Sequence, residues 1–424
     1  MNTLKPANTS ILLDIGGSYI KSATVRKLNS SLENISRIPT PSFVNSDSKL
    51  KVIPTSEFLS VVDQAIKFQL DFEPNSTRLF VSGQMGGYVV ESENSFEIVS
   101  WQDERVLLGE NFAKYLQLSE LLEESLEFQK SGSEIRPGLP LLSISTTSTN
   151  NLGINKPQKF RSVISFTTSY LTDFQNDDMH VTDAAASGFY DIFNLAWNPK
   201  LIDLVDVPLV FPNVHKEVTK IGQAEKYGID VFSGVGDQQA SLLGAGLTSM
   251  ELVVNIGTGG QVAGIHVDEE GGSYQIRPYF NDQKIRTITH LPSGRSLKAF
   301  VELVCKGSAT DNDYKKFIGM ANQIQESAAI DISDFEKTVN ELKLSRDPKE
   351  IERIPSSFFK SLIEIYTKSI LDLNLEGSLI FAGGVGQKVQ LISSELSTAA
   401  GREFEISDTA ETTLEGLRLI SESV

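Results

Sequence analysis

Two copies of one short pattern, far apart in the chain, constrain its fold most strongly. "LLDIGGSYIKSATV" begins at Leu12, and "VVNIGTGGQVAGIH" begins at Val253. Each has an apolar run, a polar residue, a glycine-rich turn and a second alternating run, which is typical of a β-hairpin. In the alignment of the two, Asp14 corresponds to Asn255. The repetition indicates two halves that open with the same hairpin, although two short motifs can also match by chance.

The rest of the chain favours a layered α/β architecture. A length of 424 residues is too great for one core, so we place a domain boundary at residue 247, between domains 1–247 and 248–424. "RSVISFTTSYLTDF", from Arg161, reads as a strand followed by a helix, and "PSSFFKSLIEIYTKSILDL", from Pro355, reads as a long helix before the strand "GSLIFAGG". Strands that alternate with helices predict α/β layers.

The composition excludes several classes of protein. A net charge of -17 argues against nucleic acid or an anionic membrane as a partner. One cysteine and four histidines argue against a disulfide framework and a His/Cys metal site, and they fit a reduced cytoplasm. No apolar run is long enough to span a bilayer. His180, beside "NDD", is expected on the surface.

Four glycine turns follow expected strands and indicate a site for nucleotide phosphates. Glycine lets backbone N–H groups approach an anion closely, although most such turns only connect strands. None of the four has the full P-loop or dinucleotide-binding pattern. The turns are "DIGGS" (14–18), "GVGD" (234–237), "NIGTGG" (255–260) and "AGGVG" (382–386).

Two aspartates in these turns could carry chemistry. Asp14 ends an apolar run, and Asp237 opens the expected helix "QQASLLGAG". Both residues could simply cap a turn or a helix. Alternatively, Asp14 could hold Mg²⁺ beside nucleotide phosphates, and Asp237 could remove the proton from a sugar hydroxyl as it attacks a phosphoryl group.

Taken together, the motifs resemble a known family. "DIGGS", "SGQMGG" (82–87), "WQDER" (101–105), "GVGDQQAS", "NIGTGG" and "AGGVG" resemble, in this order, motifs of the FGGY carbohydrate kinases of the actin–hexokinase superfamily. Within that family, "IVSWQDER", "TDAAASGFYDIFNLAWN" and "RPYFNDQ" are most similar to the sedoheptulokinase branch. The resemblance implies two ribonuclease-H-like (actin-like ATPase) domains with a nucleotide and sugar cleft between them.

The resemblance also implies a reaction and a set of site residues. The protein would be an ATP- and Mg²⁺-dependent kinase that transfers the γ-phosphate to a ketose hydroxyl. The expected ketose is sedoheptulose, and xylulose or ribulose is the alternative. The 1–247 domain would carry the sugar and the base, and the 248–424 domain the nucleotide. Asp237 would be the base and Asp14 the metal-side carboxylate. The implied sugar contacts are Gln84, Met85, Gly86, Trp101, Asp103 and Asp237, and the implied nucleotide contacts are Gly16, Gly17, Ser18, Gly257, Thr258, Gly383 and Gly384.

Some residues depart from the family pattern. Gly17 stands where the family has threonine, and Gly86 stands where a histidine is expected after Met85. These departures keep open a catalytically weak protein that binds sugar or nucleotide. A phosphatase or an acetate-kinase-like enzyme of the superfamily is a further alternative, against which "SGQMGG" and "WQDER" speak. The expected partners are a sugar and ATP in the cytoplasm, and the oligomeric state, a homodimer included, stays open.

Overall fold

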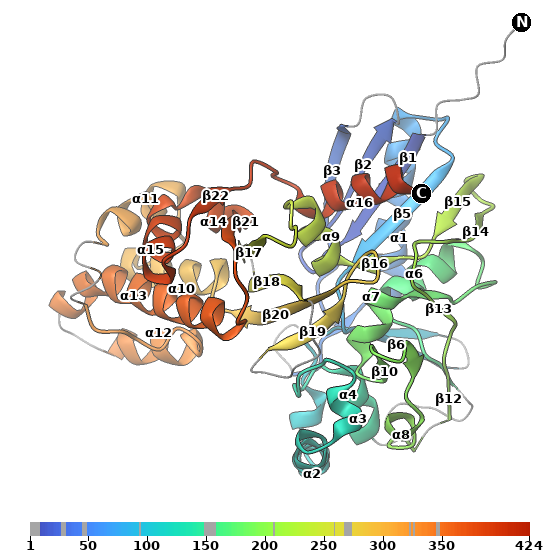
Figure 1. Cartoon of the computed structure of the whole chain (residues 1–424), viewed down its shortest axis with the longest axis horizontal. Helices are drawn as coiled ribbons and strands as arrows, with labels where there is room; N and C mark the ends of the chain where they lie inside the picture. The colour runs from blue at the N-terminus through green and yellow to red at the C-terminus, as the bar shows by residue number, and fades with distance from the viewer. Residues whose placement is uncertain are drawn as a thin grey trace, which may run out of the picture. The chain divides into compact units, whose positions relative to one another are not determined.

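The chain forms two compact α/β units in the computed structural model (Figure 1). The structure describes residues 9–26, 31–44, 49–92, 95–147, 158–206, 208–257, 259–266, 274–321, 324, 327–344 and 348–424. Unit 1 comprises Met1–Gly244, Ile276–Lys284 and Glu411–Val424, and unit 2 comprises Ala245–Gln275 and Ile285–Ala410. The sequence places a single boundary at residue 247, whereas two later segments also belong to unit 1. The assignment of sugar and nucleotide roles to the two domains stays a prediction.

A seven-stranded sheet forms the centre of unit 1. Its order is β14-β15-β5-β1-β2-β3, and β16 also pairs with β5. The expected hairpin is present, because β1 runs antiparallel to β2 and parallel to β5. The strands are β1 (Thr9–Ile15), β2 (Tyr19–Arg26), β3 (Leu32–Pro39), β5 (Arg78–Gly83), β14 (Lys220–Ala224), β15 (Ile229–Phe232) and β16 (Val235–Gly236).

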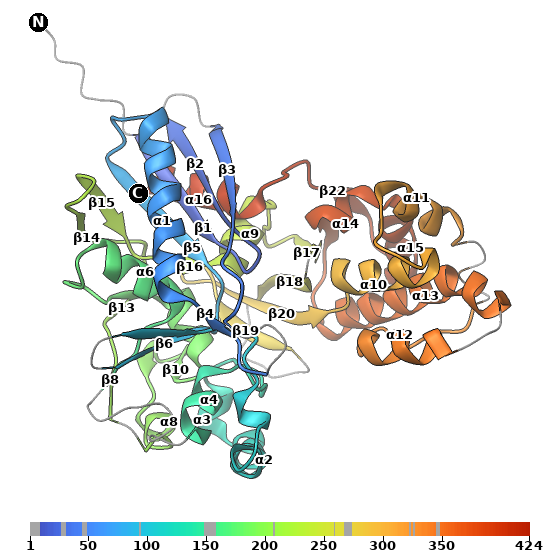
Figure 2. The ribbon, with the colours of Figure 1, turned by 180° about the vertical axis from the view of Figure 1, so that it is seen from behind.

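Helices cover both faces of this sheet. Successive residues of a strand point to opposite faces, so Ile11, Leu13 and Ile15 pack with α1 (Thr55–Phe72) and α6 (Val163–Leu171). Leu12 packs on the other face with α9 (Asp237–Gly244) and α16 (Thr412–Ser423). Figure 1 shows α9 and α16 on the near face of the sheet. Figure 2, in which the molecule is turned by 180°, shows α1 on the opposite face. By the same alternation, Asp14 belongs to the face that α9 and α16 cover.

Smaller elements complete unit 1. They include the sheet β4 (Val52–Ile53), β7 (Phe96–Val99) and β6 (Tyr88–Glu91). Two-stranded pairs are β10 (Tyr190–Asp191) with β11 (Ala196–Trp197), β12 (Leu209–Val210) with β8 (Gln158–Lys159), and β13 (Val214–His215) with β9 (Met179–His180). The remaining helices in the described part of unit 1 are η1 (Arg105–Leu107), α2 (Asn111–Glu123), α3 (Leu126–Gln129), α4 (Pro140–Thr146), α7 (Val181–Ala184), η2 (Ala185–Ser187) and α8 (Pro199–Ile202).

The strand expected at Arg161 is absent, and only its helix forms. Ser162 caps α6, because its hydroxyl accepts a hydrogen bond from the backbone N–H of Ser165, and the Ser165 side chain accepts one from Ser162 in return. This reciprocal cap fixes the helix start at Val163 and leaves a single β-bridge, between Ser162 and Tyr88, where the sequence suggests a strand.

Unit 2 repeats the central arrangement of unit 1. Its strand β17 pairs antiparallel with β18 and parallel with β21, as β1 does with β2 and β5. The sheet strands are β17 (Glu251–Ile256), β18 (Gly260–His266), β20 (Lys284–Leu291), β21 (Ser378–Ala382) and β22 (Phe404–Ile406), and β19 (Gln275–Pro278) begins at the unit border. The second hairpin is therefore present as well, and the two-fold repeat predicted from the sequence is confirmed at the level of strand topology.

Helices surround the core of unit 2. Leu252, Val254 and Ile256 of β17 pack against the buried faces of the long helix α13 and of α15. The helix expected from Pro355 is present but begins seven residues earlier. The helices are α10 (Gly294–Cys305), α11 (Asp311–Gly319), α12 (Phe335–Leu344), α13 (Pro348–Asp372), α14 (Gly383–Lys388) and α15 (Gln390–Ala400).

Candidate active site

Asp14 is a buried carboxylate at the end of β1. It is 3% exposed, the hydroxyl of Ser82 on β5 donates to its Oδ1 over 3.2 Å, and Lys21 Nζ on β2 lies 3.7 Å from its Oδ2. The two strands place these partners, because Asp14 stands opposite Ser82 and Lys21 in the strand registers. Burial raises the pKa of Asp14 to about 6, although Lys21 opposes this shift.

Lys21 links Asp14 to the C-terminal segment of unit 1. Its Nζ lies 2.9 Å from Glu411 Oε2, and Arg37 of β3 also pairs with Glu411. Burial alone would lower the pKa of Lys21, but the carboxylates of Asp14 and Glu411 raise it overall. Lys21 thus stays cationic beside the first glycine turn. The sequence motifs did not single out Lys21 or Glu411, although Lys21 follows "DIGGS" by only three residues.

The first glycine turn presents its tip to solvent. Two hydrogen bonds hold Gly16 in place. Its N–H donates to the carbonyl of Tyr19 over 3.1 Å, and its carbonyl accepts from Thr40 Oγ1 over 2.8 Å. Gly17 and Ser18 are exposed, and a Cβ added at Gly17 would meet no atom within 4 Å. A backbone turn of this kind leaves N–H groups accessible to an anion.

Asp237 is the first residue of α9 and follows directly on β16. It is half-buried, and its Oδ1 accepts a hydrogen bond from the N–H of Gln238 over 2.8 Å. Burial raises the pKa of Asp237 to about 7, and the negative charge of Asp14 adds to this shift. The structure therefore brings the two candidate aspartates of unit 1 within electrostatic reach of each other.

A buried polar chain supports the backbone just before Asp237. The N–H of Gly236 donates to Thr182 Oγ1 over 3.0 Å, and Thr182 Oγ1 in turn bonds to Nδ1 of His180 over 2.8 Å. The expectation that His180 lies on the surface is wrong, because its side chain is fully buried. Burial lowers the pKa of His180 to about 4, so the ring is neutral. Its polar neighbours in sequence gave no sign of this inward position.

The sugar-side candidates cluster around a turn that leaves β5. Gln84 is 4% exposed and its backbone N–H donates to the carbonyl of Ile15 over 2.9 Å. A Cβ added at Gly236 would lie 2.5 Å from Met85 Sδ, so Met85 packs beside the residue that precedes Asp237. Gly86 has a φ of +80°, and a Cβ there would lie 3.6 Å from Cβ of the half-buried Trp101.

Asp103 is engaged within its own loop. It is 1% exposed, and its carboxylate accepts hydrogen bonds from the Arg105 side chain over 2.7 and 3.1 Å and from the Lys51 N–H over 2.8 Å. The N–H of Arg105 adds a fourth bond over 3.0 Å. These bonds show Asp103 anchoring the loop that carries Trp101, a role that the resemblance did not suggest.

The nucleotide-side candidates of unit 2 lie where β17 and β21 end. The Gly257 N–H donates to the carbonyl of Gly259 over 3.0 Å, and Gly383 and Gly384 open α14. Gly383 has a φ of +77°, and a Cβ there would lie 2.4 Å from Asn255 Oδ1, so glycine is required. Thr258 lies outside the described residues.

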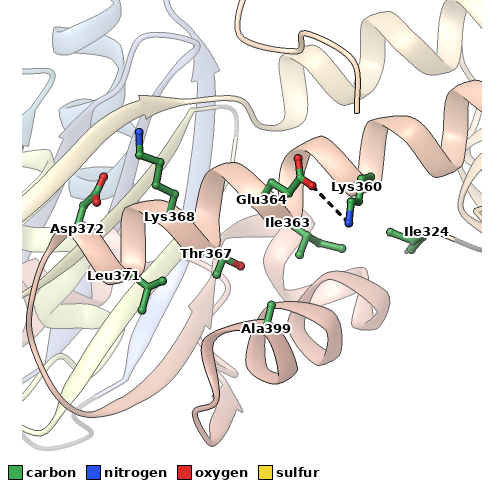
Figure 3. A pocket seen from close by; sticks show the side chains of 9 residues that line it. All are labelled: Ile324, Lys360, Ile363, Glu364, Thr367, Lys368, Leu371, Asp372 and Ala399. Carbon is green, nitrogen blue, oxygen red and sulfur yellow. Dashed lines mark ion pairs between the residues drawn. The ribbon is translucent and has the colours of Figure 1, made fainter. Parts of the chain in front are cut away.

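Unit 2 also has a surface pocket of about 370 Å³ between α13 and α15 (Figure 3). Its lining includes Lys360 and Glu364, which form an ion pair over 3.3 Å, and Ala399 from α15. None of the candidate site residues lines this pocket.

The described residues contain neither a clustered metal site nor a membrane-spanning helix. Their His, Cys, Asp and Glu side chains form no group of three or more arranged for a metal ion. Every helix in the same part of the chain is too short or too polar to cross a bilayer.

Comparisons with known proteins place this chain in a family. The model of the N-terminal domain of the FGGY family of carbohydrate kinases matches residues 10–244, more than half of the chain. A search of curated protein sequences found no match. The chain belongs to the FGGY family of carbohydrate kinases, so it is a sugar kinase by family.

Solved structures share its fold. The gluconate kinase and the ligand-bound xylulose kinase of Lactobacillus acidophilus each have a TM-score of 0.80 and 14% identity, and each match covers 98% of this chain and 89% of theirs. Plasmodium falciparum glycerol kinase with ADP has a TM-score of 0.75, 14% identity and the same coverage. At this identity the likeness shows the fold, which has two ribonuclease-H-like α/β domains, as the sequence predicted.

Proposed function

We propose that this chain is an ATP-dependent ketose kinase with Asp237 as its general base. The observation that carries the proposal is the placement of Asp237, which is half-buried, within electrostatic reach of Asp14, and has a pKa of about 7. A carboxylate with such a pKa is a base strong enough to accept a proton from a hydroxyl near neutral pH. The family of the chain supplies the reaction class.

In the proposed reaction, the acceptor hydroxyl loses its proton to Asp237 while its oxygen forms a bond to the γ-phosphorus of ATP. The bond from that phosphorus to the β-phosphate oxygen breaks, and ADP leaves. The turn at Gly16, Gly17 and Ser18 would donate hydrogen bonds to the phosphates, and Lys21 would add a positive charge. In unit 2, Gly257, Thr258, Gly383 and Gly384 are proposed to bind the nucleotide, as the family resemblance implies.

The donor set around Asp14 fits a bound Mg²⁺. Magnesium is usually held by one or two carboxylates together with phosphate oxygens and water, and Asp14 offers one buried carboxylate beside the phosphate turn. When bound, Mg²⁺ neutralises phosphate charge during transfer. Lys21, 3.7 Å from Asp14 Oδ2, favours the ionised form of the carboxylate that would hold the metal.

The proposed acceptor is sedoheptulose, with xylulose or ribulose as the alternative. Its support is the similarity of the segments around Trp101, Thr182 and Arg277 to the sedoheptulokinase branch. The similar folds of xylulose kinases support the alternative acceptors. The proposed location is the cytoplasm, where ATP is plentiful and the single cysteine stays reduced.

A second candidate is a catalytically weak protein that binds a sugar or a nucleotide. Gly86 and Gly17 favour it, because each lacks the side chain that the family pattern leads us to expect. The presence of both Asp14 and Asp237 favours the kinase.

The test is an ADP-release screen with Mg-ATP against glycerol, aldoses, ketopentoses and ketoheptoses, followed by Asp237→Asn. We expect turnover with a ketose, and a 10²- to 10⁴-fold loss of kcat in the variant, roughly the contribution of general base catalysis. Asp230→Asn, a change at the surface ion pair with Lys220, is the matched control and should keep full activity. Unchanged turnover in Asp237→Asn would overturn the mechanism, and no response to any acceptor would favour the binding protein.

A further inference from the structure

The space beside Gly86 is filled by an arginine from another part of unit 1. Arg136 lies between α3 and α4, and its Nη2 is 2.5 Å from the position that a Cβ at residue 86 would take. Its Nη1 donates to the carbonyl of Trp101 over 3.2 Å, and the guanidinium lies 5.9 Å from the centre of the Trp101 ring. A guanidinium therefore occupies the place where a family member would extend a side chain.

This guanidinium is incompletely satisfied by the protein. Its side chain is 18% exposed, and the nearest carboxylate oxygen, Glu134 Oε1, lies 3.7 Å from Nε. Among the described residues, Nε of Arg136 is buried without a hydrogen-bond acceptor. Glu134 also faces the buried Arg277, so one carboxylate is shared by two cations. Burial lowers the pKa of Arg136, and the negative charge of Glu134 opposes this shift only in part.

A second unsatisfied group lies on the same turn. Gln84 is 4% exposed, and its Nε2 has no hydrogen-bond partner in the described part of the chain. Met85, the next residue, packs against Gly236 beside Asp237. The turn 84–86 thus lies between the residue that precedes the candidate base and Arg136, and it carries one buried donor, Gln84 Nε2, that has no partner among the described residues. Buried donors without partners are costly unless water or a ligand satisfies them.

We propose that Arg136, whose guanidinium occupies the space that a side chain at position 86 would otherwise fill, binds oxygen atoms of the acceptor sugar. This inference rests on the proposed kinase function and names a specificity-determining residue for it. The flat guanidinium can donate two parallel hydrogen bonds, so it would recognise a pair of neighbouring oxygens on the acceptor.

The test compares Arg136→Met, which keeps the aliphatic packing on Trp101, with Arg136→Lys, which keeps the charge. Loss of hydrogen bonds from a charged donor should raise the acceptor KM about 10- to 150-fold in Arg136→Met. The KM for ATP should stay within about 3-fold of wild type, because no phosphate contact changes. Arg136→Lys should recover part of the acceptor affinity. Arg26→Met, at the far end of β2, is the matched control and should behave as wild type.

A binding measurement separates this inference from the proposed function. Sedoheptulose, xylulose and ribulose are titrated into wild type and both variants by calorimetry without ATP. Binding to wild type that weakens in Arg136→Met supports the inference even if no phosphate is transferred, in which case only the kinase mechanism fails. Turnover with an unchanged acceptor KM in Arg136→Met overturns the inference and leaves the kinase intact. No binding to wild type, with no turnover, overturns both.

Discussion

Asp14 and Asp237 each have a pKa above the usual value, and the negative charge of Asp14 contributes to the raised pKa of Asp237. Short motifs identified both, because a carboxylate beside a glycine turn is visible in the sequence. Glu411 and Arg136 could not be assigned to the site in this way, because they come from distant parts of the sequence, and the role of Lys21 follows from the register of the hairpin. His180 shows the same limit, since it lies on β9, whose partner strand β13 is distant in the sequence, and its neighbours in sequence do not indicate its burial.

From the pKa of the single residue Asp237, we predict that kcat/KM decreases at acidic pH. Asp237 must be ionised to accept a proton, and its pKa in the free protein is about 7. Activity should therefore rise with pH and level off above about pH 7, falling about tenfold per pH unit well below it. Initial rates at subsaturating sugar between pH 5 and 9 measure the midpoint.

Lys21→Met should move that midpoint upward, because Lys21 lowers the pKa of Asp237 through its positive charge. Lys220→Met, at an exposed ion pair with Asp230, is the control and should leave the midpoint in place. A midpoint near pH 4 in wild type would contradict the assignment of Asp237 as the base.

The position of Asp237 depends on the close packing of α9 against α16, which a glycine in each helix allows. A Cβ at Gly416 of α16 would lie 1.9 Å from the carbonyl oxygen of Ala240 in α9, and a Cβ at Gly244 would lie 1.9 Å from that of Thr412. The helices therefore pack with their backbones in contact. Local sequence patterns predicted the hairpins, the long helix and α9. The contact between α9 and α16 could not be predicted in this way, because it joins residues that are far apart in the sequence.

Gly416→Val should push α9 away from α16 and move Asp237 with it. We expect a loss of about 1–3 kcal/mol in the free energy of unfolding, as overpacking usually costs. A displacement of about 1 Å at the base should also reduce kcat by up to about 100-fold. Denaturant unfolding and initial rates measure the two effects.

Gly319→Val is the matched control, because a Cβ at Gly319 would meet no atom within 4 Å. Its stability and kcat should stay close to wild type. A Gly416→Val protein with unchanged stability would show that the helices can separate without cost.

Residues 411–424 follow unit 2 in the sequence but belong to unit 1. Leu414, Leu417 and Ile420 of α16 are buried in the same cluster as Leu12 and Phe80 of the central sheet. The Arg78 side chain also donates to the carbonyl of Ser421 over 2.7 Å. The repeated hairpin predicted two halves. The hydrophobic periodicity of α16, however, does not indicate against which half this helix packs.

A chain that ends at residue 410 should lose the fold of unit 1 and keep that of unit 2. Removal of 411–424 uncovers one face of the seven-stranded sheet, whereas every residue of unit 2 remains. Limited proteolysis with mass spectrometry should find protected peptides from 285–410 and rapid cleavage within 31–92. Equal protection of both regions would contradict the prediction, and the full-length chain is the reference.

Glu411, which pairs with Lys21 beside Asp14, is synthesised after every segment of unit 2. A nascent polypeptide that stops short of residue 411 has its first glycine turn and its candidate base, but it lacks both the acid that pairs with Lys21 and the helix that packs against α9. If the proposed reaction is correct, ATP consumption would begin only after residues 411–424 have been made, which spares the cell futile hydrolysis by half-made copies.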